Sequence, residues 1–203
     1  MLFVSGTGEV LDTLAMAAGD ESVRMELETG IADMVGFFTR SSQVASTGGR
    51  LVLGDAVDLE YRVLDSAGRM ERIVRGSKDL SLPAEMLQAE IDARLEPNPS
   101  PQFRRQIEDL PVPERRPAYS ALEVDHTGAV WLAEDRGLMM NRISSDPLFW
   151  EVFDPDGRWL GRVGTPGRFE VFEIGTDYVL GVQRDELDVE YVRMYGLTRE
   201  PSR

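Results

Sequence analysis

The chain has 203 residues, 42% of them hydrophobic, which is enough for a packed core in one large domain or two small ones. Its 36 acidic and 22 basic residues give a formal net charge of −14, which repels phosphate backbones and anionic membranes and argues against a nucleic-acid partner. No apolar run reaches the roughly 20 residues of a membrane-spanning helix, cysteine is absent and His126 is the only histidine, so a membrane span, disulfides, thiolate chemistry and multi-imidazole metal sites are excluded.

The first fifteen residues predict a β-hairpin. FVSGTGEVLDTL alternates apolar and other residues on both sides of Ser5 to Gly8, and a hydroxyl followed by glycine is typical of a tight turn. The residues that follow, Met16 to Phe37, read as a long connection.

Residues 39–75 predict two further hairpins. QVASTGGRLVLGD turns at Ser46 to Gly49, and LEYRVLDSAGRMERIV turns at Asp65 to Gly68. In each turn the Asp or Ser side chain can accept from backbone amides two residues on, and glycine supplies the positive φ. The two hairpins together form one unit of four antiparallel strands.

A helical insertion is predicted at about 81–110. AEMLQAEIDARLE carries Leu87, Ile91 and Leu95 on one stripe, and Ser100–Pro101 is a start signal for a second helix over QFRRQIEDL. We expect both helices to cap one end of the strands. A lid or docking surface is the alternative.

The hairpin pair recurs at 118–164. LEVDHTGAVWLAE turns at Asp125 to Gly128, and LFWEVFDPDGRWLGRV turns at Asp154 to Gly157 with the same spacing as the earlier Asp65 turn. Residues 168–197 then supply three strands, at about 171–174, 178–183 and 190–197. We expect Trp131 and Trp150 of the second unit to pack between neighbouring units.

Repeated four-stranded antiparallel units are the blades of a β-propeller, so we predict an all-β chain whose residues 1–203 form a single domain. The predicted fold is a partial β-propeller of about three to four blades with a short helical insertion. Its blade pieces are residues 1–15, 39–75, 118–164 and 168–197.

Residues 38–197 resemble the C-terminal end of bacterial six-bladed propeller proteins of the NHL and TolB-like type. The resemblance is carried by the hairpin that begins at Asp125, the V-F-D-P-D-G-R turn at Val152 to Arg158, and the closing strand DELDVEYVRMYGL at Asp185 to Leu197. It implies a propeller fold and little about chemistry.

Thirteen predicted strands do not complete a closed ring of blades, which leaves open sheet edges. One hypothesis is that the chain is the C-terminal part of a longer product, with an upstream signal peptide directing it to the envelope or periplasm. The chain itself shows no signal peptide, since its first residues carry Glu9 and Asp12 where a basic start is expected. The alternative is self-association of two copies through the open edges.

The tight turns should lie at one end of the blades and the long connections at the other, which places any site on the long-loop side. Acidic residues gather in the loops of that side: Asp55, Asp58, Asp135, Asp146, Asp185, Glu186 and Asp188. A rim of carboxylates would suit Ca²⁺ or a basic ligand. The simpler interpretation, which we favour, is that these are solvated loop carboxylates, and we expect no other cofactor.

We therefore predict a non-catalytic binding or sensing scaffold that presents its loops to a protein, peptide or carbohydrate. The alternative is a metal-dependent propeller hydrolase, such as a lactonase, or a lyase, in which inner-strand carboxylates hold the metal. The readable inner strands offer only Glu123 and Glu173 for that purpose.

Overall fold

The structure, a computed structural model, describes the chain except for residues 1, 5–6, 9, 28–29, 97–98 and 200–203. Its described part is mostly β, as predicted, with fifteen strands in five antiparallel sheets and three helices. The N-terminal hairpin is confirmed, because β1 (Leu2–Val4) pairs with β2 (Val10–Thr13), although the predicted turn residue Ser5 lies outside the described residues.

Three sheets follow one another along the chain, and each is built from sequential hairpins. The first sheet has the order β5 (Gln43–Thr47), β6 (Arg50–Gly54), β7 (Glu60–Leu64), β8 (Met70–Arg75). The second has β9 (Ala121–Val124), β10 (Val130–Ala133), β11 (Leu148–Phe153), β12 (Trp159–Thr165). The third has β13 (Phe169–Ile174), β14 (Tyr178–Arg184), β15 (Glu190–Gly196).

The predicted Asp-to-Gly turns form as expected. The Asp65 carboxylate accepts from the backbone amides of Ala67 and Arg69, both at 2.9 Å. Asp125 and Asp154 accept from the amides two and four residues on in the same way. The glycine of each turn has a φ between 73° and 84°, a conformation that only glycine adopts without strain.

The three sheets pack face to face in series. Tyr61 and Val52 of the first sheet bury against Leu132 of the second, while Trp131 and Trp150 of the second bury among residues of the third. The predicted position of the two tryptophans between units is thereby confirmed. Strand β9 contacts both β5 and β13, so the first strands of the three sheets lie next to one another.

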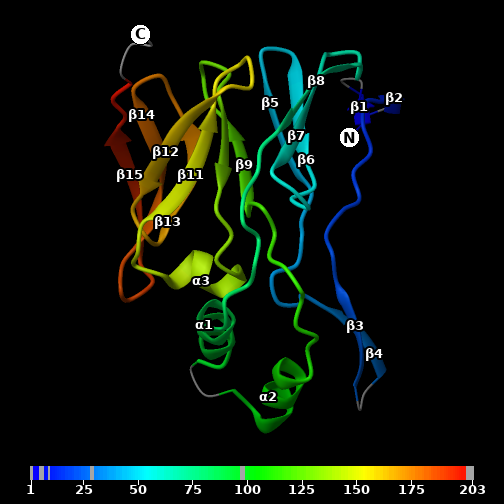
Figure 1. Cartoon of the computed structure of the whole chain (residues 1–203), viewed down its shortest axis with the longest axis vertical. Helices are drawn as coiled ribbons and strands as arrows, with labels where there is room; N and C mark the ends of the chain where they lie inside the picture. The colour runs from blue at the N-terminus through cyan, green and yellow to red at the C-terminus, as the bar shows by residue number, and fades with distance from the viewer. Residues whose placement is uncertain (1, 5–6, 9, 28–29, 97–98, 200–203) are drawn as a thin grey trace.

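The two ends of the sheets differ as the sequence predicts. The turns of the hairpins β5–β6, β7–β8, β9–β10, β11–β12 and β13–β14 lie at the upper end in Figure 1. At the lower end lie α1 (Ala84–Arg94), α2 (Pro101–Glu108), α3 (Leu138–Ile143) and the tight turn between β14 and β15. The hairpin of β3 (Val23–Leu27) and β4 (Gly30–Met34) lies there too. None of these described helices has the length and apolar character that crossing a bilayer requires.

Two of the predicted connections contain regular structure. The segment predicted as a loop from Met16 to Phe37 holds β3 and β4, and the long connection predicted from Arg136 to Pro147 holds α3. Strand β3 buries part of Val23 and Met25 against Phe37 and Phe38, a two-residue alternation that is too short to recognise in the sequence. Helix α3 has six residues, fewer than two turns, so no 3.6-residue period can develop.

Helices α1 and α2 begin where the sequence predicts, but α1 buries an unexpected face. The Ser100 hydroxyl caps α2 by accepting from the amide of Phe103 at 3.2 Å. In α1 the apolar positions Leu87 and Ile91 are only partly buried, whereas the carboxylate of Glu90 has no exposed surface.

Glu90 joins α1 to the start of α3. Its carboxylate accepts from the amides of Met139 and Met140, at 3.0 and 3.1 Å, and lies 2.7 Å from the guanidinium of Arg94. Arg94 also donates to the carbonyls of Val35 and Gly36. This buried ion pair and its hydrogen bonds therefore join α1, the start of α3 and the chain at Val35 and Gly36.

Candidate functional site

A cavity of about 740 Å³, here called the central cavity, lies where the first strands of the three sheets begin. Gln43 at the start of β5, Ala121 and Glu123 of β9, and Phe169 and Val171 of β13 line it. Its lower part is formed by the connections that carry α3 and by the segment before β5. The cavity is on the long-connection side, where the sequence places any site.

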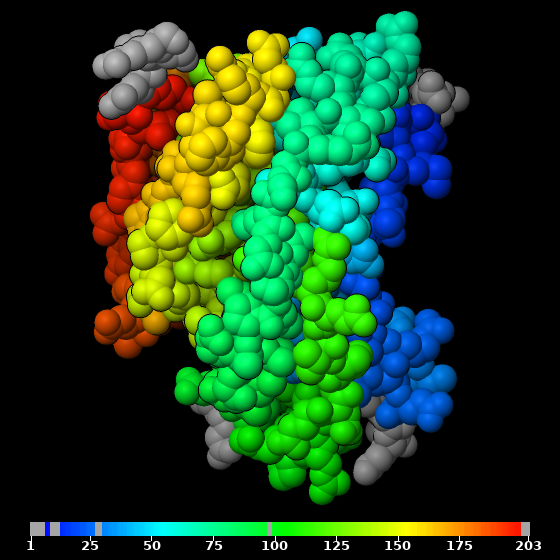
Figure 2. Space-filling model, viewed as in Figure 1, coloured from blue at the N-terminus to red at the C-terminus, as the bar shows by residue number. Residues whose placement is uncertain are grey.

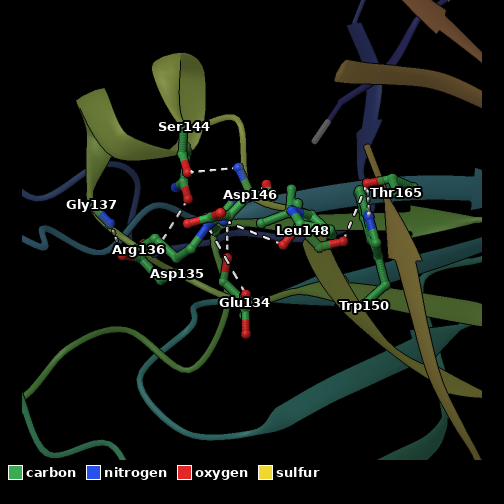
Figure 3. Close-up of polar contacts among 12 residues, drawn as sticks. Glu134, Asp135, Arg136, Gly137, Ser144, Asp146, Leu148, Trp150 and Thr165 are labelled. Carbon is green, nitrogen blue, oxygen red and sulfur yellow. Dashed lines mark hydrogen bonds and ion pairs between the residues drawn. The ribbon is translucent and has the colours of Figure 1, made fainter. Parts of the chain in front are cut away.

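Aromatic side chains in fixed positions form part of the wall. Tyr119 accepts from the amide of Ala56 at 3.3 Å and donates to the carbonyl of Glu60 at 2.9 Å. The indole of Trp150 donates to the Thr165 hydroxyl at 3.1 Å (Figure 3). Because only 1% of Tyr119 and 3% of Trp150 is exposed, these rings fix the shape of the wall and add little accessible surface to it.

Three of the arginines that line the cavity are already engaged. Arg40 pairs with Glu21 at 3.0 Å, and Arg184 pairs with Glu170 at 3.3 Å. Arg168 donates to the carbonyls of Ile143 and Asp185. Arg40 and Arg184 are thus compensated by carboxylates, whereas Arg168 is held by carbonyl groups alone, and Arg142 also lines the cavity.

Glu123 is different. It lies on β9, between the other two first strands, and its side chain is half-buried. Within the described part of the chain its carboxyl group makes neither a hydrogen bond nor an ion pair, and burial raises its pKa above the ordinary value. A carboxyl group without a partner in a cavity wall is suited to receive a donor from a ligand.

Asp135 is the second carboxyl group of the cavity. It lies two residues after the end of β10, its residue is only 6% exposed, and it accepts from the amide of Gly137 at 2.8 Å. Burial raises its pKa to about 6, the nearby Glu90 carboxylate acts in the same direction, and Arg116 and the Gly137 amide oppose it. Near neutral pH this group therefore has access to both protonation states.

The chain between Glu134 and Leu148 surrounds Asp135 (Figure 3). The guanidinium of Arg136 donates to the carbonyls of Asp146 and Pro147, both at 3.3 Å, and lies 4.0 Å from the Glu134 carboxylate. Its Nε and one Nη are buried without a hydrogen bond among the described residues. Arg136 thus holds the two ends of this connection together beside the cavity.

The structure places the seven acidic candidates on the lower connections but engages most of them separately. Asp58 pairs with Arg115 at 2.7 Å, and Asp185 accepts from the amides of Leu187 and Val189. Asp55 accepts from the amide of Val57 in a turn, and Asp135 is the buried residue of the cavity. Asp188 has a φ of 60° and lies 3.8 Å from Arg184. Asp146 and Glu186 are exposed. In the described ranges no three Asp, Glu or His side chains gather into a set that could hold a metal ion.

The two inner-strand carboxylates singled out in the sequence have different surroundings. Glu123 lines the cavity, whereas Glu173 at the upper end of β13 accepts from the Tyr178 hydroxyl at 2.5 Å and lies 3.1 Å from His126. Sequence reasoning missed the aromatic wall and the arginines. Their only signal is their position at strand starts, which becomes informative once the first strands are known to converge.

The sequence matches no known protein-family model, and no curated protein matches it.

Proposed function

We propose that this chain is a non-catalytic, propeller-like scaffold that binds a ligand in the central cavity, and that the ligand carries a cationic group received by Glu123. The partner class is a peptide or protein segment with a basic side chain. The single observation that carries the proposal is the half-buried Glu123 carboxyl group, which has no partner among the described residues.

The arrangement of the sheets supports the propeller-like part of the proposal. Successive antiparallel meanders pack face to face, their first strands lie together, and the long connections gather at one end, opposite most of the tight turns. Propellers use this arrangement to build a site around a central axis. The resemblance of residues 38–197 to NHL and TolB-like propellers agrees with it.

The size and charge of the cavity support the ligand class. A volume of about 740 Å³ is in the range of sites for small ligands or single peptide side chains. The net charge of −14 attracts cations over distances comparable with the Debye length. Val35 and Leu138, which line the cavity and are each 50% exposed, suit the apolar stem of an arginine or lysine, while Glu123 faces its charged head.

Calorimetry with small cationic probes tests the proposal. Agmatine and an arginine-containing tripeptide are titrated at pH 7.5, with a citrulline-containing tripeptide as the neutral analogue. Glu123→Gln should weaken binding of the cationic probes at least about tenfold, because it removes the charge but keeps the shape. The matched control, Glu173→Gln, removes a carboxylate outside the cavity and should leave binding unchanged.

Equal binding of the cationic and neutral tripeptides would contradict the ligand class. Binding that survives Glu123→Gln would contradict the site. Neutral oligosaccharides form a third arm, since a carbohydrate that binds independently of Glu123 would replace the cationic ligand in this proposal.

A further inference from the structure

The connection from β8 to α1 carries Lys78, the single lysine of the chain. In Figure 2 this connection runs along the face in view, beside the yellow strands of the second sheet. The amide of Gly76 donates to the carbonyl of Leu59 at 2.7 Å, and a Cβ at Gly76 would lie only 2.5 Å from a methyl group of Leu59. On the other side of the lysine, Leu80 is buried in the core shared by the first and second sheets. Lys78 is therefore held between two anchored positions.

A groove of about 480 Å³, here called the outer groove, lies beside this connection. One wall consists of Leu59 and residues 75–78, and the other comes from β11, β12 and the turn between them. No residue that lines the outer groove also lines the central cavity. Both sheets that form the groove have four strands, so it does not depend on the strand at which the third sheet ends.

Lys78 is the charged group of the outer groove that has no partner. Its side chain is half-buried. Within the described part of the chain its ammonium group makes neither a hydrogen bond nor an ion pair, and burial lowers its pKa below the ordinary value. An ammonium group that has lost part of its hydration without gaining a partner is stabilised by an anion that approaches it.

On the second-sheet side of the groove, the charged groups are engaged with one another. One oxygen of Glu151 accepts from the indole of Trp159 at 2.8 Å, and the other lies 3.3 Å from Arg162. Arg162 also lies 3.0 Å from Glu134. Glu151 and Glu134 favour the charged form of Lys78 from a distance, but neither forms an ion pair with it.

On the first-sheet side, the three carboxylates near Lys78 each have a partner: Glu60 with Arg75 at 2.6 Å, Asp58 with Arg115 at 2.7 Å, and Asp79 with the amide of Ser81 at 2.9 Å. Arg116, which disfavours the charged form of Lys78, donates to the backbone carbonyls of Asp79, Ser81 and Asp135. The carboxyl group of Asp135 is influenced by Lys78 but forms no ion pair with it. The described surroundings of Lys78 therefore contain no unengaged carboxylate that pairs with it.

An exposed aromatic ring lies in the same groove. Trp159 begins β12 and is 57% exposed, and the hydrogen bond from its indole to Glu151 fixes the position of the ring. A large ring held in place offers apolar contact at little cost in side-chain entropy. A ligand in the outer groove therefore meets one unpaired positive charge and one rigid aromatic surface.

We propose that the outer groove binds a small monocarboxylate with a planar ring, whose carboxylate pairs with Lys78 and whose ring packs on Trp159. One ammonium group without a partner matches the single charge of a carboxylate better than the two charges of a phosphate monoester. The net charge of −14 repels anions from a distance, so the contacts in the groove select this ligand and long-range attraction does not. This site is independent of the ligand proposed for the central cavity.

Calorimetry with four small probes tests the site in the intact chain. Benzoate has the charge and the ring, acetate lacks the ring, benzamide lacks the charge, and phenyl phosphate carries two charges. Benzoate should bind more tightly than each of the other three. Lys78→Gln should weaken benzoate binding at least about fivefold, because it removes the charge and keeps most of the side-chain stem. The matched control is Arg104→Gln, which removes a positive charge from an exposed position of α2 and should leave binding unchanged.

A second measurement on the wild type covers the case in which Lys78→Gln disturbs folding. Isotope-labelled lysine gives one side-chain NMR signal, because the chain has one lysine. Benzoate should shift this signal together with the indole signal of Trp159, and benzamide should not shift the lysine signal. Absence of benzoate binding, equal binding of benzoate and benzamide, binding that survives Lys78→Gln, or a lysine signal that does not move would each overturn the proposal. Tighter binding of phenyl phosphate than of benzoate would overturn the monocarboxylate class.

Discussion

Replacing Asp135 with asparagine tests how burial in the central cavity affects the charge of this carboxyl group. The carboxyl group is almost fully buried, and burial raises its pKa from 3.8 to about 6. Between these two values the folded chain holds a proton that the unfolded chain releases, so the free energy of unfolding falls as the pH rises. Above about pH 6 the carboxyl group is ionised in the folded chain as well, and the full free-energy cost of burying its charge is present.

The magnitude follows from the difference between the two pKa values. A change from 3.8 to about 6 is roughly two units, and each unit corresponds to about 1.4 kcal/mol, so the penalty is about 3 kcal/mol at neutral pH. Asparagine keeps an oxygen that can accept from the Gly137 amide and carries no charge. We therefore expect the free energy of unfolding of Asp135→Asn, relative to that of the wild type, to rise by about 3 kcal/mol as the pH is raised from 3.5 to 7.5.

Urea unfolding followed by tryptophan fluorescence at a series of pH values measures this difference. Other groups titrate in the same window, and the comparison of the two proteins cancels their contributions. Asp146→Asn, the same change at an exposed position of the same connection, is the control for loss of one negative charge. A difference that stays constant from pH 3.5 to 7.5, or that moves against the variant, would refute the reasoning.

Three further predictions concern charged groups whose surroundings only the structure reveals. Asp125 accepts from Thr127, Trp131 and Arg199, and these bonds outweigh burial and lower its pKa, so Asp125→Asn should cost about 3 kcal/mol at pH 7. The cost should shrink as the pH falls below 3.8, because the unfolded chain then takes up a proton while the folded carboxylate stays ionised to lower pH; an acid-unfolding curve parallel to that of the wild type contradicts this. Glu90→Ala should lower the free energy of unfolding in urea by about 3 to 5 kcal/mol. Glu90→Gln should lower it less, because the amide oxygen still accepts from the first amides of α3. Equal losses would show that these hydrogen bonds to α3 do not contribute. Burial lowers the pKa of Lys78, so an NMR titration of this single lysine should give a midpoint below 10.5, and a midpoint at or above that value would show that it is solvated.

Local signals predicted most of the β-structure. The turn at Asp65 or Asp154 is stabilised by hydrogen bonds to amides within four residues and by one glycine conformation, so all the interactions that specify it are adjacent in the sequence. Strand alternation is equally local, because it depends only on which side of the strand each residue takes. The cap of α2 at Ser100 is visible for the same reason.

By itself, the sequence determined thirteen of the fifteen described strands, their pairing into meanders, the two main helices and the end at which the long connections gather. Only the tertiary structure decided that Glu90 is buried, that Glu123 lacks a partner and that Asp135 has a raised pKa. These properties depend on atoms contributed by distant segments. A carboxylate in the sequence is the same letter whether water or a neighbouring sheet surrounds it, and the free energy of its charge is set by that surrounding.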